Sequence, residues 1–282
     1  MKWKGRRGSR NIEDRRRGSA RKAGQVGGIG LLVVLGLGYF LGVDVTPFLQ
    51  GGGGGTIQSS SGELSRADKE AGEFVSVVLA DTEEIWANLF RSQVGEAYNP
   101  PVLVLFKGAT QSPCGGASGA TGPFYCPGDK KVYLDTQFFT TLSQRMGAKG
   151  DFAAAYVVAH EVAHHVQNEL GILGQANRIR AQVSKEESNA ISVRIELQAD
   201  CYSGIWARRA QARFGSIEPG DIAEAMNAAK QIGDDILQRN AGRRPMPETF
   251  THGTAQQRQS WFARGYENAD IAQCDTFGVQ NL

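Results

Sequence analysis

The chain has 282 residues, enough for one large domain with accessory segments. Hydrophobic residues make up 41% and charged residues 21%, which is ordinary for a globular protein. Residues 1–22 carry a net charge of +8, whereas the rest of the chain carries −6. A mildly acidic body argues against a nucleic-acid-binding protein, so we expect no nucleic-acid partner.

The first 64 residues predict a membrane anchor. Residues 1–22 form a basic tail, and residues 23–43 contain no charged side chain. A helix over 23–43 would span about 31 Å, roughly one hydrocarbon core. The positive-inside rule then predicts a single-pass protein of the bacterial inner membrane with a cytoplasmic N-terminus. A cleavable signal peptide is the alternative interpretation.

The Gly- and Ser-rich stretch 44–64 predicts a flexible linker to the body. The body, residues 65–282, is then expected in the periplasm or outside the cell. Within it, Ser65 precedes a segment whose apolar residues recur at helical spacing, so a capped helix is expected there. The short apolar runs 100–106 and 132–135 predict buried strands. The second run is also a candidate edge against which an extended substrate would pair.

Most of the remaining body is predicted to be helical. Further helices are expected up to Met146, from Asp151, and over 187–214, 218–239 and 254–269. The fold class is therefore α+β, mainly helical with a small sheet, preceded by one transmembrane helix.

Four cysteines suggest two disulfides if the body lies outside the cytoplasm. The pairing we expect, Cys114–Cys126 and Cys201–Cys274, is one of three possible connectivities. The alternative is that Cys201 is a free buried thiol, because it lies in a predicted helix.

Three of the four histidines lie in the segment HEVAHH, which begins at residue 160. His160 and His164 are four residues apart, so both project from one side of a helix and can hold one metal ion. In the His-Glu-x-x-His pattern the two histidines bind zinc, and the glutamate, here Glu161, takes a proton from metal-bound water. His165 falls on the side away from the core and is predicted to be a surface residue or an outer neighbour of the site.

A catalytic zinc needs a third protein ligand. A third histidine six residues after His164 is excluded, because that position is Leu170. Glu196 on a following helix is the predicted ligand. Asp200, one turn later, can reach the far nitrogen of a ligating histidine and fix its orientation.

The remaining histidine, His252, precedes a predicted helix. Peptide hydrolysis generates a tetrahedral oxyanion, and a donor placed on it lowers the barrier. We expect His252 to supply that donor, with Arg258 as an orienting or additional cation. A histidine that merely caps the helix is the alternative.

The segments HEVAHHVQN, ELQADCYSGIWA and FTHGTAQQRQSWFARGYE, in this order, resemble the bacterial family of neutral zinc metallopeptidases. The similarity covers nearly the whole chain. It implies a single N-terminal anchor, a zincin-like fold, a glutamate as third zinc ligand, and peptidase activity.

Three functions fit these patterns. The first is a membrane-anchored, zinc-dependent endopeptidase acting on a peptide or protein. The second is a non-catalytic, zinc-stabilised module that holds a partner at the membrane. The third is a zinc hydrolase of a non-peptide amide. Glu161 favours an enzyme, because structural zinc sites normally close with four protein ligands and need no free base.

Overall fold

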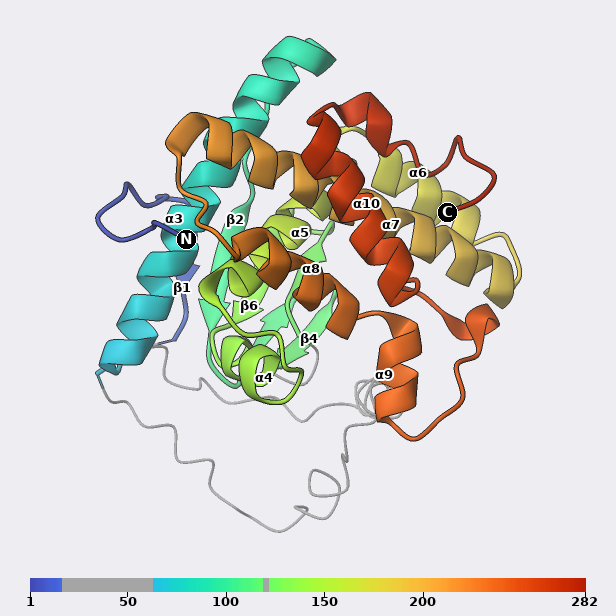
Figure 1. Cartoon of the computed structure of the whole chain (residues 1–282), viewed down its shortest axis with the longest axis horizontal. Helices are drawn as coiled ribbons and strands as arrows, with labels where there is room; N and C mark the ends of the chain where they lie inside the picture. The colour runs from blue at the N-terminus through green and yellow to red at the C-terminus, as the bar shows by residue number, and fades with distance from the viewer. Residues whose placement is uncertain (17–62, 119–121) are drawn as a thin grey trace.

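The computed structural model describes residues 1–16, 63–118 and 122–282, which form one α+β body dominated by helices (Figure 1). The strands are β1 (Ile12–Asp14), β2 (Val102–Phe106), β3 (Ala109–Ser112), β4 (Gly115–Ser118), β5 (Phe124–Cys126) and β6 (Lys131–Asp135). The α-helices are α3 (Arg66–Leu89), α4 (Phe138–Gln144), α5 (Asp151–Glu169), α6 (Ile172–Arg180), α7 (Lys185–Phe214), α8 (Asp221–Gln231), α9 (Asp234–Asn240) and α10 (Ala255–Asn268). Three short helices complete the chain, namely η1 (Phe90–Val94), η2 (Pro247–Thr249) and η3 (Ile271–Cys274).

The main sheet has the strand order β1-β2-β6-β5, and β3 and β4 form a separate hairpin. β6 is parallel to β2 on one side and antiparallel to β5 on the other. Tyr133 pairs with Val104 and with Phe124, so both of its edges are occupied. The prediction that this strand offers an edge for substrate pairing at Tyr133 is therefore wrong, because β5 already fills that place.

Helix α5 occupies the middle of the body. It packs against α3, α7 and α8, and also against β5 and β6 (Figure 1). Its alanines and valines are almost fully buried on all sides. A helix enclosed in this way is held rigidly by packing, which suits an element that carries the HEVAH segment.

The predicted helices are largely present. Ser65 caps α3 by accepting a hydrogen bond from the backbone of Asp68, as expected from the sequence. The predicted single helix over 218–239 is instead two helices, α8 and α9. The chain leaves helical geometry at Ile232, and Gly233 has an extended backbone before α9 begins. This break turns Asp234 towards the loop before α10.

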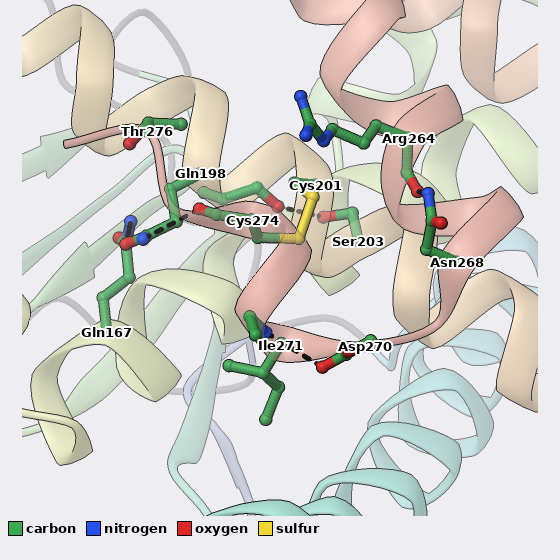
Figure 2. The surroundings of a disulfide bond; sticks show 12 residues. Gln167, Gln198, Cys201, Ser203, Arg264, Asn268, Asp270, Ile271, Cys274 and Thr276 are labelled. Atoms are coloured by element: carbon green, nitrogen blue, oxygen red, sulfur yellow. Dashed lines mark hydrogen bonds between the residues drawn. A yellow bond between two sulfur atoms is a disulfide. The ribbon is translucent and has the colours of Figure 1, made fainter. Parts of the chain in front are cut away.

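Both expected disulfides are present. Cys114 is bonded to Cys126, and Cys201 on α7 is bonded to Cys274 in η3. The second bond fastens the C-terminal segment onto α7 (Figure 2). Cys201 is therefore not a free thiol.

The N-terminal residues belong to the folded body. Met1 and Trp3 are each only 7% exposed, and the Trp3 ring packs edge-on against Phe74 of α3. Arg6 makes a bidentate ion pair with Asp81, at 2.6 and 2.7 Å. β1 then pairs with β2. A segment that completes the sheet of the body cannot lie across a membrane from it, so the predicted localisation, with a cytoplasmic tail and an external body, is wrong.

The predicted fold class included one transmembrane helix, and this part of the prediction is wrong. Among the described residues, no helix combines the length and the apolar character needed to cross a bilayer. Residues 23–43, on which that prediction rested, lie outside the described residues, as does most of the predicted linker 44–64. The structure thus supports a mainly helical α+β fold with a small sheet, and it gives no support for a membrane anchor.

Candidate metal centre

The structure brings His160, His164 and Glu196 together, the first two from α5 and the third from α7. Glu196 Oε2 lies 3.1 Å from His160 Nε2, and Glu196 Oε1 lies 3.3 Å from His164 Nε2. One donor atom from each of the three side chains fits within a span of 4.8 Å. This spacing is that of a three-ligand cation site, and both histidines turn Nε2 towards its centre.

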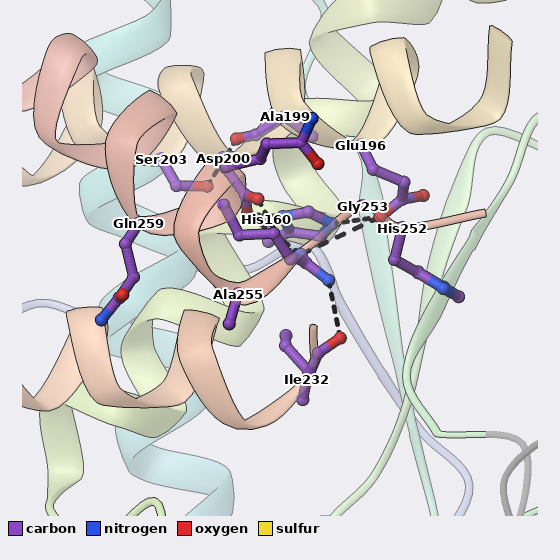
Figure 3. A network of polar contacts seen from close by, with 12 residues as sticks. His160, Glu196, Ala199, Asp200, Ser203, Ile232, His252, Gly253, Ala255 and Gln259 are labelled. Atoms are coloured by element: carbon purple, nitrogen blue, oxygen red, sulfur yellow. Dashed lines mark hydrogen bonds and ion pairs between the residues drawn. The ribbon is translucent and has the colours of Figure 1, made fainter. Parts of the chain in front are cut away.

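Asp200 of α7 lies beside His160. Its Oδ1 lies 2.9 Å from His160 Nδ1, although the ring is not oriented for a hydrogen bond there. Asp200 is completely buried and accepts a short hydrogen bond of 2.5 Å from the Tyr156 hydroxyl. The carboxylate thus lies within ion-pair distance of the His160 ring nitrogen that does not face Glu196 (Figure 3).

Arg258 neutralises Asp200. Its Nε donates to Asp200 Oδ2 at 2.9 Å and its Nη2 to Asp200 Oδ1 at 3.0 Å. Nη1 donates to the carbonyl of Ile232 at 3.4 Å. Arg258 is only 1% exposed, so this pairing compensates for a buried cation. Its Nη2 also lies 3.9 Å from Glu196 Oε2, and Arg258 is among the residues that line the cleft, so the guanidinium touches two acidic groups of the site.

The electrostatics of the three-ligand cluster favour a positive charge at its centre. Burial lowers the pKa of His160, but Asp200 and Glu196 outweigh it and raise that pKa to about 10. Burial likewise opposes ionisation of Glu196, yet His164 and His160 hold its pKa well below the ordinary value.

Glu161 is buried, with 8% exposure, and its carboxyl group faces the cleft in front of the cluster. Burial raises its pKa, although His164 and His160 act in the opposite direction. No protein group within the described ranges donates a hydrogen bond to its carboxylate. The group is thus available to a water molecule in the cleft.

The cleft has a volume of about 960 Å³. The three-ligand cluster and Glu161 form part of its wall, together with residues of β5, α4, α6 and the loop before α10. Arg145, Arg180 and His252 also line the cleft. A space of this size can accommodate several residues of an extended peptide.

His252 lies in the loop before α10, where Asp234 holds it. Asp234 Oδ2 accepts hydrogen bonds from the backbone N–H groups of Thr251, His252 and Gly253, at 2.7, 2.6 and 3.0 Å. Asp234 Oδ1 lies 3.2 Å from His252 Nδ1. The His252 side chain remains 44% exposed and lies beside Glu196 (Figure 3). Burial lowers its pKa, but the Asp234 hydrogen bond and the charge of Glu196 raise it overall.

His165 does not belong to the cluster. It is only 1% exposed, and its Nε2 donates to the backbone carbonyl of Asn99 at 2.6 Å while Nδ1 lies 3.1 Å from the Tyr125 hydroxyl. The prediction of a surface position is wrong, because β5 and the segment before β2 cover that side of α5. Burial lowers the pKa of His165, so the neutral ring is a packing element of the core.

Four supporting residues were not identified from the sequence: Tyr156, Gln167, Gln198 and Asp234. Tyr156 precedes His160 by one helical turn and Gln167 follows His164 by three residues, so helical spacing on α5 could have indicated both. Gln198 lies between Glu196 and Asp200 on α7. Asp234 has no comparable signal, because the loop before α10 returns to it only in three dimensions.

Comparison with known proteins identifies the family of the chain. The family described as "Putative neutral zinc metallopeptidase" matches residues 1–277. The chain is 45% identical over 288 residues to "Uncharacterized protein YpfJ" of Escherichia coli K12, with 99% of both chains covered. It is 42% identical over 231 residues to "Uncharacterized protein Rv2575" of Mycobacterium tuberculosis H37Rv, covering 77% of this chain and 75% of that protein. No solved structure matches. The chain therefore belongs to the neutral zinc metallopeptidase family.

Proposed function

We propose that the protein is a zinc-dependent endopeptidase that hydrolyses peptide bonds in its cleft. The observation that carries this proposal is the arrangement of three ligand side chains and one unligated carboxylate, Glu161, on the wall of an open cleft. A structural zinc site closes with four protein ligands, whereas a catalytic site keeps a position open for water or substrate. This arrangement also disfavours a purely zinc-stabilised interaction module.

The donor set fits zinc. Two imidazole nitrogens and one carboxylate oxygen are a ligand set of catalytic zinc sites, and His160, His164 and Glu196 would hold the ion. Bound zinc supplies Lewis-acid chemistry, which acidifies water and polarises a carbonyl group. Asp200 would keep the His160 ring turned so that Nε2 faces the ion.

Glu161 would act as the general base. Its buried carboxylate faces the cleft and no donor from the described chain engages it, so it can take a proton from the attacking water. The same carboxyl group can then deliver that proton to the departing amine. Burial raises the pKa of Glu161 towards the range where a carboxylate is an effective base.

His252 would stabilise the oxyanion. Asp234 engages its Nδ1 and fixes the backbone of its loop, which leaves Nε2 as the free ring nitrogen. The pKa of His252 is raised, so the protonated ring, which can donate from Nε2, is favoured. Such a donor placed on the developing negative charge lowers the barrier by several kcal/mol, about 3 in measured cases.

Glu161→Gln tests the general base directly. The variant should bind zinc with wild-type affinity, because residue 161 is not a ligand, but cleave peptides at least about a hundredfold more slowly. His160→Ala is the matched variant that should lose both zinc and cleavage. Zinc content by mass spectrometry and cleavage of a peptide library by the full chain are the two measurements.

Two results would contradict the proposal. Cleavage by Glu161→Gln at the wild-type rate would exclude Glu161 as the base. A zinc-loaded wild-type protein that cuts no member of the peptide library would instead support a non-catalytic module.

A further inference from the structure

A chain of two buried amides connects His164 to the disulfide Cys201–Cys274. We propose that Gln167 and Gln198 set the tautomer of His164 for metal binding, and that the disulfide holds this relay in place. Metal affinity then depends on whether the disulfide is formed. The inference rests on the metal site of the proposed function.

The contacts of the relay form a continuous line. His164 Nδ1 lies 2.9 Å from Gln167 Oε1. Gln167 Nε2 donates to Gln198 Oε1 at 3.0 Å and to the backbone carbonyl of Ile195 at 2.8 Å. Gln198 Nε2 donates to the carbonyl of Cys274 at 3.0 Å (Figure 2). The metal ligand and the disulfide are thus joined by three consecutive side-chain hydrogen bonds.

The two backbone carbonyls determine the direction of every bond in the relay. A carbonyl oxygen can only accept, so the nitrogen of the Gln198 amide must face Cys274 and that of Gln167 must face Ile195. The Gln167 oxygen is then left to face His164, which requires the proton of the neutral ring on Nδ1. His164 Nε2 consequently keeps its lone pair, and this is the nitrogen that faces Glu196 in the cluster.

Burial prevents water from taking over these roles. Gln167 is 0% exposed and Gln198 is 3% exposed. If the Gln167 amide turned over, its NH₂ group would face His164 Nδ1 and drive the ring proton to Nε2. That tautomer cannot bind a metal through Nε2, so the amide orientation decides whether the ring can be a ligand.

The opposite end of the relay depends on the C-terminal segment. Cys274 is completely buried in η3, and its covalent bond to Cys201 fixes its carbonyl above α7. Arg194 also holds this segment, by donating to the carbonyls of Thr276 and Val279. Without the disulfide, only such non-covalent contacts hold the segment, and the Cys274 carbonyl is no longer fixed next to the Gln198 amide.

His160 offers a comparison within the same site. The group beside its Nδ1 is the Asp200 carboxylate. Both oxygens of a carboxylate can only accept hydrogen bonds, so turning the group over does not change which ring nitrogen it favours for the proton. The relay behind His164 is made of amides, which have two orientations. For this reason we expect the disulfide to act on the metal site through His164.

The test is the zinc dissociation constant of the full chain, measured by competition with a chromophoric chelator. Gln167→Leu, Gln198→Leu and the double variant Cys201→Ser/Cys274→Ser should each bind zinc about 10- to 100-fold more weakly, as is usual for lost outer partners. Gln175→Leu, on the exposed side of α6, and Cys114→Ser/Cys126→Ser are the matched controls and should stay within about twofold of wild type. A phosphine reductant should weaken zinc binding by wild type but leave Cys201→Ser/Cys274→Ser unchanged.

Gln167→Glu distinguishes an effect of residue 167 on the His164 tautomer from an effect on the stability of the fold. A glutamate at 167 still accepts from His164 Nδ1, but it cannot donate to Ile195 or Gln198. Zinc affinity should therefore stay closer to wild type than in Gln167→Leu, while the melting temperature falls in both variants. In zinc-loaded, ¹⁵N-labelled protein, the His164 Nδ1–H resonance should be visible in wild type and Gln167→Glu and absent in Gln167→Leu.

The outcomes are distinguishable. Wild-type protein that binds no zinc overturns the proposed function together with this inference. Wild-type protein that binds zinc, with Gln198→Leu and Cys201→Ser/Cys274→Ser binding equally well, overturns the inference alone. Equal zinc affinities for Gln167→Glu and Gln167→Leu would show that the amide supports only the fold.

Discussion

Asp234 determines how His252 is presented to the cleft, and this has a consequence for pH dependence. The charged groups around His252 are Asp234 and Glu196, which raise its pKa, and Arg258, which lowers it. His252 Nδ1 lies 3.2 Å from Asp234 Oδ1, which can only accept, and 3.1 Å from the Thr251 hydroxyl. The neutral ring therefore carries its proton on Nδ1 and has none on Nε2 to donate. We therefore predict that kcat/KM falls as the pH rises through the pKa of His252, which lies above the ordinary value of 6.5.

Asp234→Asn tests this assignment. The variant removes a charge that raises the pKa of His252, so the fall in kcat/KM should begin at lower pH. His252→Gln should have a lower kcat/KM at every pH, and its kcat/KM should not show this fall as the pH rises. The raised pKa of His252 also affects the stability of the fold. Its contribution to the free energy of unfolding is fully present below about pH 6.5 and is lost as the pH rises through the pKa of the folded state. A profile identical to wild type in Asp234→Asn would exclude His252 as the titrating group.

At this scale, helical spacing is what made the three proposed ligands predictable. His160 and His164 are related by one turn, and Glu196 and Asp200 repeat that spacing on a second helix. His165 was misjudged because the amphipathic pattern predicts a solvent-facing side at this position, whereas β5 and the segment before β2 cover that side of α5. The Gln167–Gln198 relay and Asp234 were not predicted, because their partners are backbone carbonyls and amides, which leave no trace in the sequence.

At the scale of elements, the crossing of α7 and α10 sets the distance between Asp200 and Arg258. A Cβ built at Gly265 would lie 1.8 Å from the Cys201 carbonyl oxygen, and one at Gly204 would lie 2.0 Å from the Phe262 carbonyl oxygen. The two helices are therefore in backbone contact next to the buried ion pair. Side chains any larger would push α10, and with it Arg258, away from α7.

Gly265→Ala should accordingly destabilise the protein by about 1–3 kcal/mol or more, the usual cost of overpacking a tight interface. Gly174→Ala in α6 is the control, because its Cβ would meet only the end of the Arg178 side chain, at 3.7 Å. It should be neutral or slightly stabilising. Urea unfolding of both variants measures the difference, and equal midpoints would contradict the close packing.

Helices were more predictable than strands in this chain. Capping residues such as Ser65 and long apolar periodicities mark most helices, and the break at Gly233 was missed because the apolar pattern continues across it. β1, β3, β4 and β5 were not predicted. Each is only three or four residues long and takes its pairing from distant segments, so local sequence carries little signal for it.

At the scale of the whole molecule, residues 1–16 are part of the same folded domain as the residues from 65 onwards. Composition separated a basic tail from a body starting at residue 65, yet β1 pairs with β2 at one edge of the main sheet. Arg6 compensates the charge of Asp81, which is only 3% exposed. Net charge could not reveal this, because an arginine in a buried ion pair counts the same as one in a solvated tail.

Trp3→Ala measures how strongly this segment stabilises the body. Trp3 is 7% exposed and packs on Phe74, so truncation should cost about 3–5 kcal/mol, as for other buried aromatic residues. Lys4→Ala is the neighbouring control. Its side chain is 74% exposed, and we expect a change within about 0.5 kcal/mol. If urea unfolding gave both variants the same free energy, the N-terminal segment would not pack on α3 in solution. A large loss for Trp3→Ala alone would instead establish that segment as part of the hydrophobic core, which a tail on the far side of a membrane could never be.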